Sequence, residues 1–127
     1  MQVIASRTFK AAADLAQKIL VKLAGGEIVA NTVADTDEAI GVNDYAVASG
    51  DLACVNLVGG KTLEITAAGV IAADAAVYAA DGGKVQELPV AAGTYVRIGT
   101  ALEAAGADGD IVEILPLKIG TTVTVSA

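Results

Sequence analysis

The stretch that decides the fold is GTALEAAGADGDIVEIL, residues 99–115. Residues 101–105 are good helix formers, but three glycines interrupt the stretch, and each glycine inside a helix costs about 1 kcal/mol relative to alanine. The β-branched residues that follow favour a strand, and the Asp-Gly-Asp at 108–110 is typical of a turn. We therefore expect a strand that ends near Thr100, a short loop with at most one helical turn, and a second strand over residues 111–115.

Short apolar runs alternate with glycine- or aspartate-rich turns along the rest of the chain. Two runs are typical of hairpins: residues 76–88, with a turn at 81–83, and residues 20–32, with a turn at Gly25-Gly26. The alternating Thr and Val of the tail predict a further strand. Turns spaced by about 8–12 residues mark sandwiches and barrels. We therefore expect an all-β fold, a small antiparallel β-barrel or sandwich of short strands with at most one short helical segment.

The segment 8–23 admits two interpretations. It has the periodicity of an amphipathic helix whose apolar stripe begins at Phe9. Its second half also alternates, with Ile19, Val21 and Leu23 on one side, which is typical of a half-buried strand. We favour a strand for this second half, because the glycine pair that follows closes a hairpin.

Three segments share one local pattern, small residues and an aspartate ahead of an apolar run. They are SGDLACVNL (49–57), AADAAVYAA (72–80) and DGDIVEIL (108–115). Turns that enter strands commonly have this composition. The spacing of the three is too irregular for a solenoid, so we interpret the pattern as one turn device used several times.

Composition limits the classes of function. The chain has 127 residues, which predicts a single domain, and a net charge of −7. Residues 1–22 carry four basic and one acidic side chain, whereas the rest carry four basic and fourteen acidic ones. An acidic body repels nucleic acid. Charged residues interrupt every apolar run well before the roughly 20 residues that a membrane helix needs, so we expect neither nucleic acid nor membrane as a partner.

The residue types needed for catalysis are scarce. The sequence has no histidine and a single cysteine, Cys54, which excludes a histidine-based triad and a thiolate zinc site. Gly60-Lys61-Thr62 lacks the earlier glycine of a phosphate-binding loop, since Val55 holds that place. The Asp-Gly-Asp at 108–110 lacks the ligand spacing of a calcium loop. We therefore expect no catalytic, metal-binding or cofactor-binding residues, no cofactor and no small-molecule substrate.

Three segments carry a resemblance to a known family. RIGTALEAAGADGDIVEILPL (97–117) resembles the closing motif of the capsid decoration, or cement, proteins of tailed phages. GVIAADAAVYAADGGKV (69–85) resembles a central hairpin of that family, and AIGVNDYAVASGDLACVNLVGG (39–60) resembles the segment before it. Ala73 departs from the family pattern, which usually has glycine before the aspartate. The likeness extends from about residue 15 to residue 117.

The resemblance implies a non-enzymatic virion protein that forms a homotrimer on the outer surface of the capsid. It would be made in the host cytoplasm, bind the major capsid protein and stabilise contacts between neighbouring capsid subunits. An alternative stays open, another β-rich structural or adhesive module such as a fibre or carbohydrate-binding domain. The low aromatic content, 3%, counts against a sugar-binding surface.

We expect three regions along the chain: an N-terminal arm (1–14), a β domain (15–117) and a C-terminal extension (118–127). The extension can add an edge strand to this subunit or to a neighbour. The N-terminal arm combines positive charge with apolar side chains, so we expect it to dock on an acidic partner. The expected partner-interface residues are Val3, Ile4, Arg7, Phe9 and Lys10.

Overall fold

The computed structural model describes residues 6–32, 39–58, 62–117, 119 and 121–126. These residues form an all-β fold whose only described helical element is one 3₁₀ turn, η1 (Asp81–Gly83). The strands are β1 (Ser6–Lys10), β2 (Leu20–Ala24), β3 (Glu27–Ala30), β4 (Gly41–Asn43), β5 (Leu52–Leu57), β6 (Leu63–Thr66), β7 (Ala76–Ala79), β8 (Val85–Gln86), β9 (Gly93–Ala101), β10 (Ile111–Leu115) and β11 (Thr122–Val125).

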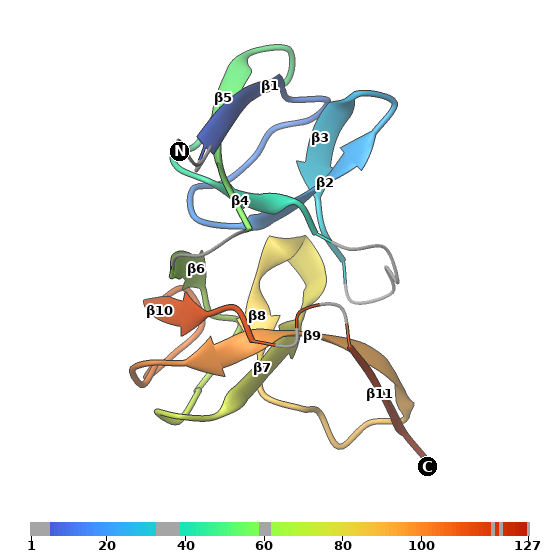
Figure 1. The fold of residues 1–127 in the computed structure, drawn as a ribbon, viewed down its shortest axis with the longest axis vertical. Coiled ribbons are helices and arrows are strands. Elements are labelled where there is room, and N and C mark those ends of the chain that lie inside the picture. The colour runs from blue at the N-terminus through green and yellow to red at the C-terminus, as the bar shows by residue number, and fades with distance from the viewer. Residues whose placement is uncertain (1–5, 33–38, 59–61, 118, 120, 127) are drawn as a thin grey trace, which may run out of the picture.

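The strands form two antiparallel sheets, one above the other in Figure 1. The first sheet has the order β1-β5-β4-β2-β3, and the second has the order β6-β10-β9-β7-β8, with β11 paired to β9. The expected all-β class is confirmed. The architecture is sandwich-like and does not close into a barrel.

The opening stretch forms two strands, as expected. β9 ends at Ala101, β10 begins at Ile111, and the loop between them contains no helical turn. The side chain of Asp110 organises this loop, because its Oδ2 accepts hydrogen bonds from the backbone N–H groups of Gly106 and Ala107 (2.9 and 3.2 Å). Gly109 has φ of 96°, a conformation that favours glycine over other residues.

The helix considered for residues 8–23 is not formed. β1 and β2 occupy the two ends of this segment, and β2 and β3 form the hairpin expected at Gly25-Gly26. Both glycines have positive φ, 60° and 84°, as a tight two-residue turn requires. The expected half-buried alternation is not observed, because Leu20 is fully buried on the side opposite Ile19 and Val21, and Leu23 is 53% exposed.

The two sheets repeat one arrangement, which divides the chain into a first half (6–58) and a second half (62–117). β1 and β6 are equivalent, as are β5 and β10, β4 and β9, β2 and β7, and β3 and β8. Isolated bridges follow the same repeat: Ala11 pairs with Ile28 in parallel, and Ala67 pairs with Val85 in parallel. The chain is therefore a structural duplication.

Single residues obey the repeat as well. Lys18 and Asp74 hold equivalent positions, and both have left-handed backbone, with φ of 53° and 69°. Each donates its backbone N–H to the last residue of a strand in its own half. Lys18 donates to Asn43 O in β4 (2.9 Å), and Asp74 donates to Ala101 O in β9 (2.8 Å). An equivalent backbone contact in the two halves thus requires the same unusual conformation of two different residues.

Two of the three similar segments, 49–57 and 108–115, are equivalent positions of the duplication. In each, the turn glycine donates its N–H to an alanine carbonyl, Gly50 to Ala11 and Gly109 to Ala67 (2.8 and 2.9 Å). The turn device expected from the sequence is therefore part of a larger repeat in these two segments, because their pairing partners are also repeated. The third segment, 72–80, occupies a different place in the repeat.

The two halves are packed together through backbone and apolar contacts. Thr66 N–H donates to Lys18 O, and Gly83 N–H donates to Asn31 O (both 2.7 Å). One buried apolar cluster lies within the first half. The other fills the second half and also contains Leu20, Ala39 and Val42 of the first. The outer side of the first sheet therefore covers the open end of the second core.

The ends of the described chain belong to the sheets. Residues 6–10, part of the expected N-terminal arm, form β1 and pair with β5 along their whole length. Ala11 is fully buried. In the expected C-terminal extension, β11 pairs with the first residues of β9 in the same chain, from Gly93 to Val96.

Candidate interaction surface

Three of the five expected partner-interface residues lie on β1, at the edge of the first sheet. Arg7 and Lys10 are exposed, and the half-buried Phe9 packs against the first core. The guanidinium carbon of Arg7 lies 4.9 Å from the centre of the Phe9 ring, which is a cation–π geometry. Val3 and Ile4 lie outside the described residues.

β1 brings positive charge to one end of the first half. Lys10 Nζ lies 3.6 Å from Glu27 Oε2, and both side chains are well exposed. An exposed ion pair contributes little to stability, on the order of 0–1 kcal/mol. With the exposed Leu23 on the neighbouring hairpin, this end combines cations with apolar surface, and it can accept an acidic partner.

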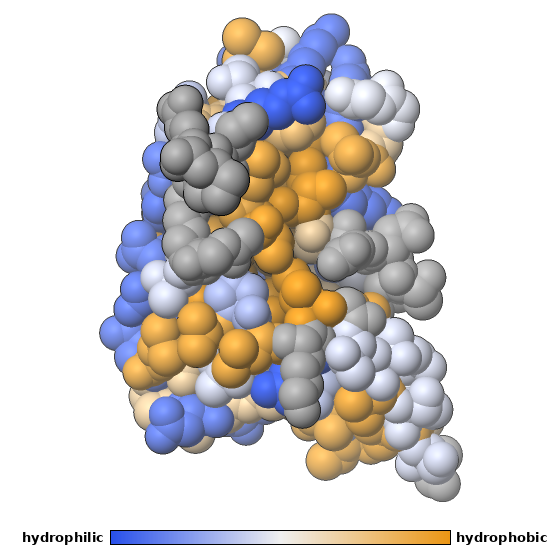
Figure 2. Space-filling model, in the orientation of Figure 1, coloured by the Kyte–Doolittle hydropathy of each residue, from blue (hydrophilic) through white to orange (hydrophobic). Residues whose placement is uncertain are grey.

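A second candidate surface is apolar. Figure 2 shows a band of apolar side chains on one face of the molecule, over the first sheet and towards the second. Ala39, Ile40, Leu57 and Val58 line an open groove of about 350 Å³. Apolar patches that stay open to solvent are typical of contact surfaces between proteins.

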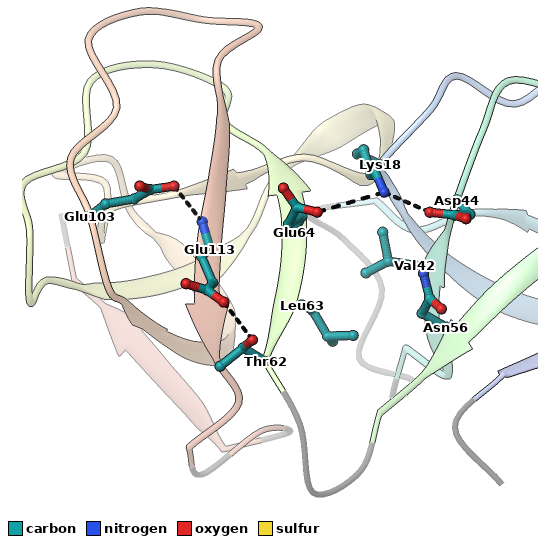
Figure 3. A pocket seen from close by; sticks show the side chains of 9 residues that line it. All are labelled: Lys18, Val42, Asp44, Asn56, Thr62, Leu63, Glu64, Glu103 and Glu113. Carbon is teal, nitrogen blue, oxygen red and sulfur yellow. Dashed lines mark hydrogen bonds and ion pairs between the residues drawn. The ribbon is translucent and has the colours of Figure 1, made fainter.

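A polar pocket of about 350 Å³ lies between the halves. Lys18 sits between two carboxylates in Figure 3, with Nζ at 2.6 Å from Asp44 Oδ1 and 3.9 Å from Glu64 Oε1. On the other side, Glu113 Oε2 accepts a hydrogen bond from Thr62 Oγ1 at 2.7 Å. Glu103 Oε1 accepts one from the backbone N–H of Glu113 at 3.1 Å. Of these interactions, the ion pair between Lys18 and Glu64 connects the two halves, so the pocket is a joint between them.

The hydrogen bond to Asp44 raises the pKa of Lys18 above its ordinary value of 10.5, although partial burial opposes the shift. The ion pair therefore stabilises the fold fully below pH 10.5, and this stabilisation is lost as the pH rises through the folded-state pKa. We expect Asp44→Asn to lower the pKa of Lys18. The difference in free energy of unfolding between wild type and variant should shrink from neutral to alkaline pH.

NMR titration of the Lys18 side chain and urea unfolding at several pH values measure the two effects. Asp108→Asn is a matched control, because Asp108 also pairs with a lysine, Lys84 at 2.8 Å, but in a more exposed setting. The control should change the stability less at neutral pH. A Lys18 titration midpoint that stays unchanged in Asp44→Asn would contradict the assignment.

The described residues contain no group of three or more His, Cys, Asp or Glu that could hold a metal ion. Cys54 is a free, half-buried thiol. Within the same residues, no helix has the length and apolar character to cross a membrane. The features that the structure does bring together are surfaces and a joint between sheets, which suit binding to other proteins.

The apolar groove and the polar pocket are not among the candidates predicted from the sequence. The apolar groove joins the start of β4 to the end of β5, and the polar pocket joins the two halves. Both depend on contacts between residues far apart in the chain. The left-handed conformation of Lys18 is also invisible in the sequence, since lysine rarely adopts it.

Comparison with known proteins identifies the class of the chain. A family model described as phage cement protein matches residues 5–116. Among solved structures, the N base of the head fibre gp8.5 of bacteriophage phi29 is similar, with a TM-score of 0.69 and 19% sequence identity over 90% of this chain and 94% of that one. At this identity the likeness shows the fold. No curated protein matches the chain.

Proposed function

Because the chain belongs to the phage cement protein family, we propose that it binds the outer surface of an assembled phage head and stabilises contacts between neighbouring major capsid subunits. The chain is a structural protein of the phage capsid. The observation that carries the proposal is the extent of the family match, residues 5–116, which spans both halves of the duplication.

The physical properties of the chain support this role. Many copies crowd on a capsid, and a net charge of −7 keeps such copies soluble and apart from the packaged nucleic acid. The described surface offers apolar and cationic areas for protein contacts. We propose a homotrimer, made in the host cytoplasm, whose partner-interface residues include Val3, Ile4, Arg7, Phe9 and Lys10.

A second candidate function is supported by the structural likeness to a head fibre base. In that case the chain would bind the head to carry another structure, and the capsid itself would gain no stability. The two candidates share head binding and differ in its consequence.

We expect the purified protein to cosediment with phage heads that lack it and to raise the temperature at which those heads release their DNA. The physical reason is that each bound copy adds buried contact area between capsid subunits. A protein that binds the intact head but not the disrupted head stabilises the intact one. Heads already saturated with the protein serve as the control and should take up none. Protein that stays in the supernatant would contradict both candidates, whereas binding without a higher release temperature would favour the fibre base.

A deletion of residues 1–5 tests the N-terminal part of the interface. It removes Val3 and Ile4 but leaves β1 in the sheet, whereas a deletion through Lys10 would also remove the partner of β5. Head binding should be lost while circular dichroism and trimer mass stay unchanged. Undiminished head binding by the shortened chain would show that these residues are dispensable.

A further inference from the structure

The contact between the two halves joins two different surfaces. The first half contributes the outer side of its sheet, where Lys18, Leu20 and Val42 lie; we call this the face. The second half contributes the end of its core, marked by Leu63, Thr66 and Gly83; we call this the end. A contact between two unlike surfaces is heterologous. It leaves two surfaces unused: the end of the first half and the face of the second half.

The duplication shows where the unused surfaces are. The end of the first half, equivalent to Leu63, Thr66 and Gly83, consists of Arg7, Lys10 and Gly26. The face of the second half corresponds to Asp74, Ala76 and Thr100. Leu63 and Thr66 are buried, but Arg7 and Lys10 are exposed, and Asp74 is exposed as well.

We propose that a second copy of this chain fills the unused pair: the face of the second half of one copy docks on the end of the first half of the next. The contact repeats, between chains, the arrangement that the two halves already have within one chain. The inference deepens the proposed homotrimer and rests on it. Three copies would present six halves joined head to tail, and a heterologous contact of this kind forms a ring when its rotation closes.

The charges of the unused surfaces are complementary. Within the chain, Lys18 on the face lies 3.9 Å from Glu64 at the end. Between chains Asp74 replaces the lysine on the face. Glu64 corresponds to the uncharged Thr8, but Arg7 and Lys10 on the same strand supply cations at the end, where Lys10 also lies 3.6 Å from Glu27. Complementary charges of this kind select the correct partner and its register.

The end of the first half also exposes an apolar side chain whose equivalent in the second half is buried. Leu23 corresponds to Ala79, which is fully buried in the cluster that contains Leu20 and Val42. Leu23 itself is 53% exposed. A second copy seated on this end would cover Leu23 and the half-buried Phe9. The interface residues of β1 would then contact the neighbouring copy, and the head contact would fall to Val3 and Ile4.

The contact between copies should be weaker than the one within the chain. Leu20 and Val42 are fully buried on the face of the first half. Ala76 and Thr100 hold the equivalent places, and they offer less apolar area to bury. A polar face stays soluble on a free chain, which suits a contact made after folding.

A disulfide between Lys10→Cys and Asp74→Cys tests the inference in a Cys54→Ser background. The equivalent pair within the chain is Thr66 and Lys18, joined by a backbone hydrogen bond of 2.7 Å, so the two α-carbons should lie within disulfide reach. Mild oxidation should link the chains covalently, with the trimer as the largest product on a non-reducing gel. Lys10→Cys with Thr124→Cys, an exposed position on β11, is the control and should stay unlinked.

The charge reversal Asp74→Lys provides a second readout. Lysine fits this left-handed position, because Lys18 adopts the same conformation in the first half. Sedimentation velocity should show weaker self-association for Asp74→Lys, about tenfold, and recovery when it is combined with Lys10→Glu. The melting temperature at a dilution where the chains are separate should not change.

Each outcome decides the inference. A trimer without cross-links would overturn the assignment of surfaces and leave the homotrimer intact. A chain that stays monomeric would overturn both, and cross-linked products that extend beyond three chains would overturn the ring. Head binding is measured separately, so its failure would bear on the proposed function and not on this contact.

Discussion

Gly99→Ala should cost about 3 kcal/mol of the free energy of unfolding, enough to lower the melting temperature by roughly 10 °C. Gly99 is buried in β9, between β7 and β10. A Cβ at this position would overlap the backbone carbonyl oxygen of Leu115 and lie 2.9 Å from its carbonyl carbon. Backbone atoms in the middle of a sheet cannot move aside without breaking their own pairing, so the strain falls on the fold.

The duplication supplies an independent repeat of the same experiment. Gly41 is the equivalent residue of the first half, and a Cβ there would overlap the carbonyl oxygen of Asn56. Gly41→Ala should therefore be destabilising to a similar extent. Gly69→Ala is the matched control, because nothing lies within 4 Å of the added carbon and its backbone is not left-handed. Urea unfolding of the three variants measures the effects, and a Gly99→Ala variant as stable as the control would refute the packing argument.

The elements that could be predicted from the sequence are those specified by neighbouring residues. The turns at Gly25-Gly26, 81–83 and 108–110 fall where expected because their backbone conformations need glycine or a short polar side chain. Each turn then fixes the ends of the strands on either side, as for β9 and β10. The resemblance carried by residues 39–60, 69–85 and 97–117 pointed to the phage cement proteins, the family whose model matches the chain.

The duplication could not be predicted because equivalent positions face different surroundings. Leu20 is buried against the second half, whereas the equivalent Ala76 is only partly buried. Leu63 and Arg7 are equivalent too, one buried at the joint and the other exposed. Different surroundings select different residue types, so similarity between the halves survives mainly at backbone-critical positions such as Gly41 and Gly99.

The candidate surface was likewise predictable only where a property depends on neighbouring residues. The exposure of Arg7 and Lys10 follows from their charge, which is a local property. Their place in a sheet depends on pairing with β5, more than forty residues away along the chain. The apolar groove likewise joins β4 to β5, and no single segment of sequence carries such information.

Asn43→Ala should be as damaging as the glycine substitutions, with a loss of about 3 kcal/mol. Asn43 is fully buried, and its side chain serves three backbone groups. Its Oδ1 accepts from Ile19 N–H at 3.1 Å, and its Nδ2 donates to Ala16 O at 2.5 Å and to Tyr45 O at 3.1 Å. Removing the amide leaves the buried N–H of Ile19 without this acceptor and breaks two part-buried hydrogen bonds as well. An unsatisfied buried group costs about 1–3 kcal/mol, and each part-buried bond adds about 1 kcal/mol.

Asn43→Asp separates the two roles of the side chain, because a carboxylate keeps the acceptor for Ile19 and loses both donors. It should therefore also destabilise the fold, and more strongly at neutral than at acidic pH, since burial disfavours the ionised form. Gln86→Ala is the control: its Nε2 donates one partly buried hydrogen bond, to Ala79 O at 3.0 Å, and should cost only about 1 kcal/mol. Equal losses for Asn43→Ala and Gln86→Ala in urea unfolding would show that Asn43 does not hold the loop before β2 against β4. The equivalent residue of the second half is Ala101, whose side chain forms no hydrogen bond. In that loop Ala72, the equivalent of Ala16, donates its N–H to Glu87 Oε2 at 2.7 Å.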